Sequence, residues 1–185
     1  MADPNVRVAR KLLGHLVRQP RTSPAESFVE CVHWLGPMVL GVCRRILGNQ
    51  AEADDAFQAT FLAVFRKWDS VRDRRAVAGW VHRIAIRVAV RLARRRTTVP
   101  LSPAPAVAAP IVDDLSWKEV RAVLDEELAR LPDGLRTPLV LCYLNGMSRE
   151  SAADILGWSV RTLHRRLEDG RARLHGALAD RKSVV

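Results

Sequence analysis

The chain has 185 residues, a formal net charge of +10 at pH 7 and 48% hydrophobic residues. That length suits one ordinary domain or two small ones, and the hydrophobic content suits soluble globular cores. Arginine supplies most of the positive charge, which favours a partner that carries phosphates over a generic solubilised surface. The first twenty residues hold no apolar signal core, and no apolar run reaches the roughly 18 residues of a membrane span, so we expect a cytoplasmic protein.

The three cysteines, Cys31, Cys43 and Cys142, are odd in number and form no C-x-x-C pair. This pattern argues against a disulfide framework and a cysteine-rich zinc site. His33 could join Cys31 and Cys43, but three potential ligands without a fourth do not make a structural zinc site. We therefore expect the cysteines to lie in a core, and we expect no metal or other cofactor.

Helix start and stop signals recur over residues 25–96 and 117–178, whereas alternating strand patterns are missing. The sequence therefore predicts an all-α fold of two small helical domains, 25–96 and 117–185. Between them, residues 97–116 are predicted to form an extended linker, because prolines remove backbone donors and disfavour helix before them. Residues 1–24 are predicted to be a basic N-terminal tail.

Capping signals divide the first domain into helices. Pro37 is predicted to open a helix that runs to Leu47, and Gly48 to close it. Asn49 and Glu52 have the spacing of a capping box before the strongest helical pattern of the chain.

The start of that helix is acidic and polar, with Glu52, Asp54, Asp55 and Gln58 in its first turns. Carboxylates there complement the positive end of the helix dipole, by ~0.3–1 kcal/mol for each well-placed charge. The dipole alone explains their position, and a binding site for a partner is the alternative.

The next predicted helix, residues 77–96, has an apolar face and an arginine stripe. Trp80, Ile84, Val88 and Leu92 form the apolar face, and Arg83, Arg87, Arg91 and Arg95 follow one another at i+4 steps. Like charges at this spacing cost a few tenths of a kcal/mol each in an isolated helix, unless a polyanion neutralises them. The stripe favours a nucleic acid over an anionic membrane surface, because the apolar face is needed for the core.

The second domain ends in two helices separated by a glycine. Ser148 is predicted to cap the first, Gly157 to end it and Ser159 to cap the second. Such a pair predicts a helix-turn-helix, whose second helix commonly enters the DNA major groove. An ordinary helical hairpin with a solvated basic face is the alternative.

Three segments together resemble a known family, the extracytoplasmic-function (ECF) sigma factors of bacterial RNA polymerase. "RRILGNQAEADDAFQATFLAVFRKWDSV" is similar to the family's core-polymerase-binding segment, and "AGWVHRIAIRVAVRLARRR" is similar to its promoter-melting helix. "LPDGLRTPLVLCYLNGMSRESAADILGWSVRTLHRRL" resembles its domain for the upstream promoter element. The resemblance covers roughly residues 25–178, in the family's order, with a proline-rich linker between the domains.

The resemblance implies a sigma factor that directs core polymerase to promoters and helps melt them, without bond-making chemistry of its own. It places the docking site for the polymerase's largest subunit at Asp54, Asp55, Gln58 and Phe61. It assigns the minus-ten element to a loop that holds a flipped base and to side chains along the melted strand: Arg72, Asp73, Arg74 and Arg75, then Trp80, Arg83 and Arg87.

For the minus-thirty-five element, the resemblance implies base reading by His164, Arg165 and Arg166, and phosphate contacts by Arg149 and Arg161. Ser159 and Thr162, at the start of the same helix, belong to this surface. The implied partners are the two largest subunits of the core polymerase, promoter DNA and an anti-sigma factor.

The chain departs from the family pattern at two places. Arg87 stands where the family usually has asparagine, and Glu168 and Asp169 stand where the recognition helix often continues with aromatic or basic residues.

Two other classes of protein fit parts of the sequence. A helix-turn-helix regulator that is no polymerase subunit would use the same C-terminal motif, but the first domain matches a polymerase-docking domain. A resolvase or nuclease would need a nucleophile near arginines or carboxylates gathered on a metal. Tyr143 is the only tyrosine, and the acidic cluster has no second cluster to meet it.

Overall fold

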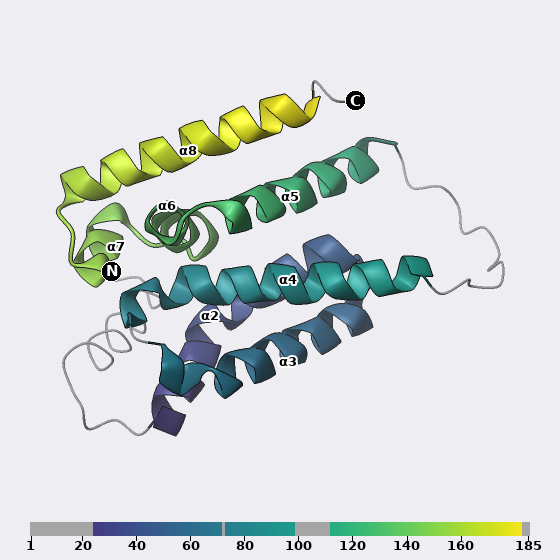
Figure 1. The fold of residues 1–185 in the computed structure, drawn as a ribbon, viewed down its shortest axis with the longest axis horizontal. Coiled ribbons are helices and arrows are strands. Elements are labelled where there is room, and N and C mark those ends of the chain that lie inside the picture. The colour runs from purple at the N-terminus through teal and green to yellow at the C-terminus, as the bar shows by residue number, and fades with distance from the viewer. Residues whose placement is uncertain (1–23, 72, 99–111, 183–185) are drawn as a thin grey trace.

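The computed structural model describes residues 24–71, 73–98 and 112–182, and these residues form helices without a strand. The helices are α2 (Pro24–Leu47), α3 (Gln50–Arg66), α4 (Val77–Thr98), α5 (Val112–Arg130), α6 (Asp133–Leu139), α7 (Arg149–Leu156) and α8 (Val160–Lys182). Short helical turns η1 (Trp68–Ser70), η2 (Arg74–Ala76) and η3 (Val140–Leu144) connect them. The predicted all-α fold is confirmed, and Figure 1 shows its arrangement.

Helices α2, α3 and α4 form the N-terminal half, in which each packs against the other two. Helix α2 begins at Pro24, so the predicted helix start at Pro37 is wrong: this proline lies inside the helix. Pro37 removes one backbone donor. Side chains on both sides of Pro37, among them Leu35 and Val39, are buried. Their packing against other helices stabilises α2 through the proline, and local sequence signals do not predict such packing.

Local capping explains where α3 starts. Gly48 has a φ of 68°, a left-handed conformation that favours glycine and ends α2. The side-chain oxygen of Asn49 then accepts a hydrogen bond of 2.9 Å from the backbone N–H of Ala51. The predicted break between these helices is therefore confirmed.

The predicted helix-turn-helix is also confirmed. The Ser148 hydroxyl accepts from the backbone N–H of Ser151 at the start of α7, and Gly157 ends α7 with a φ of 67°. The Ser159 hydroxyl accepts from the backbone N–H of Thr162, which caps α8. Buried Ala152, Ile155 and Leu163, among others, join the two helices to the core.

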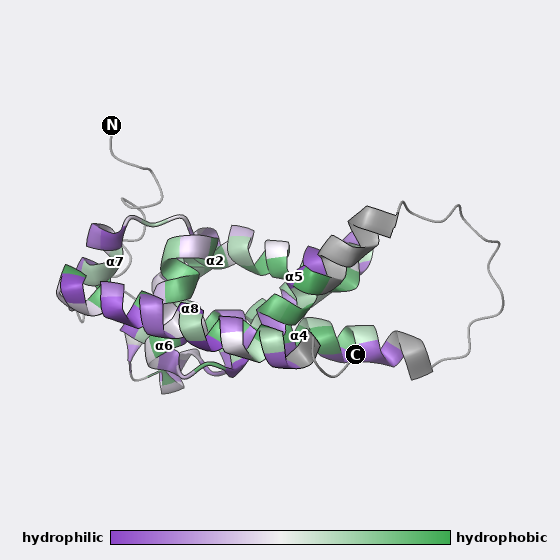
Figure 2. Ribbon diagram, turned by 90° about the horizontal axis from the view of Figure 1, so that it is seen from above, coloured by the Kyte–Doolittle hydropathy of each residue, from purple (hydrophilic) through white to green (hydrophobic). Residues whose placement is uncertain are grey.

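The two halves pack against each other. In Figure 1, α5 and α6 lie between α8 on one side and α4 on the other, with α3 farthest from α8. Helix α4 contacts α5, α6 and η3, and α5 also contacts α2. The buried apolar residues of both halves form one cluster. Figure 2 shows apolar and polar residues alternating along the helices, the pattern of helices that bury one face.

Part of the predicted linker is helical. Helix α4 runs to Thr98 and α5 begins at Val112, so residues 97–98 and 112–116 belong to helices. The remaining linker residues, 99–111, with Pro100, Pro103, Pro105 and Pro110, and residues 1–23 of the predicted tail lie outside the described residues.

Candidate nucleic-acid interface

The arginine stripe of α4 lies on the surface of the N-terminal half. Arg87, Arg91 and Arg95 are exposed and Arg83 is half-buried. A cavity of about 470 Å³ opens along this stretch of α4, lined by Arg87, Val90, Arg91, Arg94 and Arg95. The stripe thus forms a cationic surface suited to a phosphate backbone.

The loop before α4 presents some of the predicted minus-ten residues. The exposed carboxylate of Asp73 accepts a hydrogen bond of 3.0 Å from the backbone N–H of Arg75. Arg75 is exposed, and Trp80 is half-buried and packs on the core. Arg72, together with the side chain of Arg74, lies outside the described residues.

Arg136, in α6, is a buried cation beside this surface that sequence reasoning missed. Its guanidinium donates to the carbonyls of Gly79 at 3.0 Å, Ala129 at 3.0 Å and Leu131 at 2.6 Å, and it pairs with Asp133. Burial, then the charges of Arg83 and Arg87, lowers the pKa of Arg136 to about 10, so it stays charged at neutral pH. The local sequence does not predict the burial of Arg136, because an arginine flanked by apolar residues can be exposed or buried in a helix.

The helix-turn-helix carries a second group of polar side chains. Arg161 and Arg165 are exposed, and Arg166 is half-buried. The Arg149 guanidinium lies 3.3 Å from Nε2 of His164. The hydroxyls of Ser159 and Thr162 lie 2.9 Å apart. The predicted minus-thirty-five residues are therefore gathered at one end of α8.

The predicted docking residues on α3 are not all on its surface. Asp55 and Gln58 are exposed and Asp54 is half-buried, its carboxylate 3.3 Å from the Gln50 amide. Phe61, by contrast, is only 6% exposed. Its ring packs edge-on against Phe57, with the centroids 5.0 Å apart.

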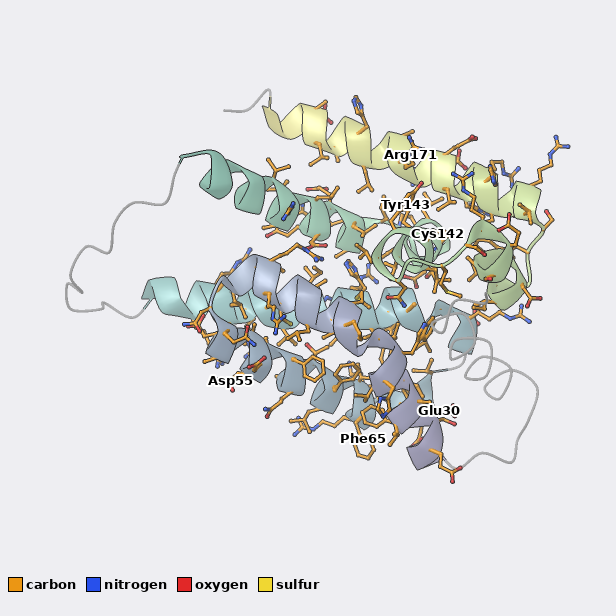
Figure 3. The ribbon with its side chains drawn as sticks, turned by 180° about the vertical axis from the view of Figure 1, so that it is seen from behind. Glu30, Asp55, Phe65, Cys142, Tyr143 and Arg171 are labelled. Carbon is orange, nitrogen blue, oxygen red and sulfur yellow. The ribbon has the colours of Figure 1, made fainter. Side chains whose placement is uncertain are left out.

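Two apolar side chains of α3 that sequence reasoning did not assign to a partner surface face solvent instead. Leu62 is 58% exposed and Phe65 is 57% exposed. Asp55, Gln58, Leu62 and Phe65 follow one another at three- or four-residue steps, so they share one helix face. Figure 3 labels Asp55 and Phe65 on this helix. That spacing was visible in the sequence, but the choice of the exposed face was not.

The cysteines occupy the places expected of core residues: Cys31 and Cys43 are buried and Cys142 is half-buried, all three as free thiols. Burial raises the pKa of the Cys43 thiol to about 11, which keeps it protonated and unreactive. Within the described residues, no three side chains of histidine, cysteine, aspartate or glutamate gather as metal ligands. Nor is any helix of this part of the chain long and apolar enough to cross a membrane.

Fold and site together define an all-helical protein with a helix-turn-helix and two arginine-rich surfaces. Two family models cover most of the described residues: Sigma-70 region 2 matches residues 32–98, and Sigma-70, region 4 matches residues 121–174. The chain belongs to the sigma-70 family of RNA polymerase sigma factors, in its ECF group.

Relatives support this membership. The ECF RNA polymerase sigma factor SigE of Mycolicibacterium smegmatis is 29% identical, over 85% of this chain and 63% of its own length. This chain therefore spans less than two thirds of that relative. SigW of Bacillus subtilis is 26% identical, over 89% of this chain and 95% of its own length. The sigma factor CnrH of Cupriavidus metallidurans is 31% identical, over 88% and 92%. A solved structure of CnrH with the cytosolic domain of CnrY covers 96% of this chain at 24% identity, with a TM-score of 0.38.

Proposed function

We propose that this chain is a dissociable specificity subunit that directs core RNA polymerase to particular promoters and helps melt them. The observation that carries the proposal is the presence of both sigma regions, in order, each with its own arginine-rich surface. The work is recognition and strand separation, and the catalytic step belongs to the polymerase. Since its partner is the polymerase on the chromosome, the chain acts in the cytoplasm.

The polymerase docks on the exposed face of α3. Asp55 and Gln58 supply its polar part, with Asp54 beside them, and Leu62 and Phe65 supply its apolar part. An apolar patch rimmed by acidic side chains suits a partner with basic and apolar groups. Phe61 supports this surface from beneath through Phe28, whose ring packs edge-on against both Phe61 and Phe65.

The minus-ten element is held by the loop before α4 and by the first turns of that helix. Extracting a base costs a few kcal/mol, which a pocket and phosphate contacts must offset. Asp73 and Arg75 lie at the loop, and Trp80, Arg83 and Arg87 follow along α4. Arg72 and Arg74 complete the set that we assign to this element. Arg87 adds a phosphate contact where the family usually has an amide.

The minus-thirty-five element is read by α8. We assign Arg165 and Arg166 to base edges, where a bidentate contact to guanine is the commonest specific pair. Arg161, with Ser159 and Thr162, lies at the start of α8, where backbone N–H groups favour phosphate. Arg149, whose guanidinium lies 3.3 Å from Nε2 of His164, binds the phosphate backbone, and His164 reads a base edge with the two arginines. Glu168 and Asp169 limit the contacts farther along, because carboxylates are repelled by phosphate.

We assign residues 25–96 as the domain for polymerase binding and the minus-ten element, and residues 117–185 as the domain for the minus-thirty-five element, joined by the linker. An anti-sigma factor is a further proposed partner. A helix-turn-helix regulator that is not a polymerase subunit is less well supported, because that function does not account for the match to Sigma-70 region 2.

Transcription with purified core polymerase tests the proposal. We expect specific initiation from the chain's own promoters only when the chain is added. A dependence on some other sigma factor, with this chain changing only the level of transcription, would favour the regulator instead.

A further inference from the structure

An apolar patch lies where the start of α2 meets the end of α3. Val29 of α2 is 53% exposed, and Leu62 and Phe65 of α3 are 58% and 57% exposed. Phe28 precedes Val29, and its ring packs edge-on against the ring of Phe65, with the centroids 5.0 Å apart. The exposed side chains therefore flank one helix contact, and Figure 3 labels Phe65 there. We call Val29, Leu62 and Phe65 the α2–α3 patch.

The α2–α3 patch extends beyond the docking surface that we assign to the polymerase. That surface includes Leu62 and Phe65, whereas Val29 lies on α2. Exposed apolar patches mark binding sites and, when nothing covers them, favour aggregation. The polymerase covers its part of the patch only while it is bound. A second occupant, present in the free chain, accounts for both the extent of the patch and its cover.

The side chain that follows Val29 is a carboxylate with an unsatisfied oxygen. Oε2 of Glu30 is buried and accepts no hydrogen bond from the part of the chain that the structure describes. Burial of a carboxylate oxygen without a donor costs free energy, and a guanidinium or ammonium group placed against it supplies the missing bond. Asp55 is exposed on the same face of α3 as Leu62, about 10 Å before it along the helix. An occupant of the patch should therefore be both apolar and basic.

The chain itself contains such a segment, residues 6–17, which precede α2 and lie outside the described residues. Apolar side chains recur in it at i, i+3, i+7 and i+10, the spacing of one helix face: Val6, Ala9, Leu13 and Leu16. Basic side chains lie between and after them: Arg7, Arg10, Lys11, Arg18 and Arg21. The only acidic residue before Pro24 is Asp3. The segment thus complements the patch in both hydropathy and charge.

The segment is also close enough to reach the patch. Residues 18–23 separate it from Pro24, where α2 begins, and six extended residues span up to about 20 Å. Val29 lies five residues after Pro24, or about 7.5 Å along the axis of α2. A helix over residues 6–17 would be about 18 Å long, and neighbouring helices pack about 8–10 Å apart. Such a helix can contact α2 and α3 at the same time.

We propose that residues 6–17 dock as an amphipathic helix on the α2–α3 patch, with the apolar stripe on Val29, Leu62 and Phe65 and a basic side chain against Glu30. The docking buries the patch in the free chain and gives the Glu30 oxygen a donor. Core polymerase displaces the segment, because both bind Leu62 and Phe65. This displacement rests on the proposed function, whereas the docking does not.

Photo-cross-linking in the whole chain tests the docking. The photoreactive amino acid p-benzoyl-phenylalanine replaces Leu62, and mass spectrometry identifies the residues to which it links after irradiation. We expect the main product to be a link within one chain, to residues 6–17. The same amino acid in place of Val120, which is 46% exposed on α5, is the control and should give no such link.

Two results would overturn the docking: no link to residues 6–17, or a link between two chains, which would make a second copy the occupant. Core polymerase added in excess should remove the link within the chain. A link that persists in the polymerase-bound chain would show that the segment and the polymerase use different surfaces. Failure of the polymerase to bind would count against the proposed function, while the link would still support the docking.

Substitutions provide an independent measurement. Leu13→Gln/Leu16→Gln removes two apolar side chains from the stripe, so the link should fall roughly tenfold or more, and the chain should bind core polymerase several-fold more tightly. Val8→Gln is the control, because Val8 lies off the stripe. Equal links in these two variants would count against the docking. Glu30→Gln should weaken the link several-fold, and an unchanged link would exclude the pairing with Glu30.

Discussion

At the scale of the residue, the buried ionisable groups determine how the stability of the fold depends on pH. Burial lowers the pKa of His82, and this outweighs the opposing effect of Asp125, so the imidazole is neutral in the folded chain. Burial raises the pKa of Asp125, but His82 and Arg45 together lower it more, so it stays ionised. Both folded-state pKa values lie below the ordinary ones, so both groups contribute stability that is lost as the pH falls.

His82 gives the first prediction. Below pH 6.5, the ordinary value for histidine, the unfolded chain takes up a proton that the folded chain does not. The free energy of unfolding should therefore fall by up to about 1.4 kcal/mol per pH unit, until the folded-state pKa is reached. Urea denaturation of wild type and His82→Gln between pH 7.5 and 5.5 measures it. The same pH dependence in both proteins would show that His82 is not the source.

Arg136 gives the second prediction. Arg136→Met leaves the carbonyls of Gly79, Ala129 and Leu131 without this donor, so it should lower the free energy of unfolding by about 3 kcal/mol. Arg130→Met is the matched control. Arg130 pairs with Glu126 and Glu127 within α5 but is 60% exposed, and its loss should cost less than about 1 kcal/mol. Equal losses in the two variants would contradict the buried role of Arg136.

At the scale of the element, each functional helix has one face for the core and one for a partner. On α3, Phe61 faces inward while Asp55 and Leu62 face outward. On α8, Leu163 and Leu167 are buried while Arg161 and Arg165 are exposed. A substitution on one face should therefore change stability, and a substitution on the other should change binding.

The third prediction concerns α3. Changing both Asp54 and Asp55 to Ala should weaken binding to core polymerase by more than about 1 kcal/mol while costing little stability. Leu62→Gln should behave in the same way. Phe61→Ala should instead cost about 3–5 kcal/mol of stability. Binding titrations paired with melting curves separate these cases, and a lowered melting temperature with unchanged binding would leave the carboxylates only their helix-dipole role.

The fourth prediction concerns the helix-turn-helix. Arg165→Ala should weaken binding of an upstream-element duplex by ~1–3 kcal/mol and relax the preference at one or two base pairs. Arg149→Ala should weaken all duplexes alike and reduce the salt slope by about one. Titrations over a range of salt concentrations measure both effects. An unchanged base preference after substitution of His164, Arg165 and Arg166 in turn would rule out base reading by these residues.

At the scale of the whole molecule, the two halves share one buried cluster, although each also has its own helix contacts. The proline-rich segment between them is the site where we expect a protease to cut first. Because the halves share this cluster, cleavage there should not release them from each other.

The fifth prediction concerns proteolysis of the segment between the two halves. After limited proteolysis between residues 97 and 116, the two fragments should still elute together in size-exclusion chromatography, held by the contacts of Arg45 and Arg136. Gly79→Ala should weaken that association, because a Cβ at this position of α4 would lie 3.2 Å from the Cα of Thr137 in α6. Wild-type fragments that separate at once would show that the halves are independent in the free chain.

The sequence by itself determined the helical class, the helix-turn-helix and the caps at Asn49, Ser148 and Gly157, because those hydrogen bonds join residues only a few positions apart. It also determined the family, because the three segments that resemble sigma-factor segments follow one another in the family's order. Only the tertiary structure decided that α2 continues through Pro37, that Leu62 rather than Phe61 faces solvent, and that Arg136 is buried. These features depend on which helix faces meet, and those contacts join residues as far apart as Arg45 and Asp125, whose pairing no local pattern contains.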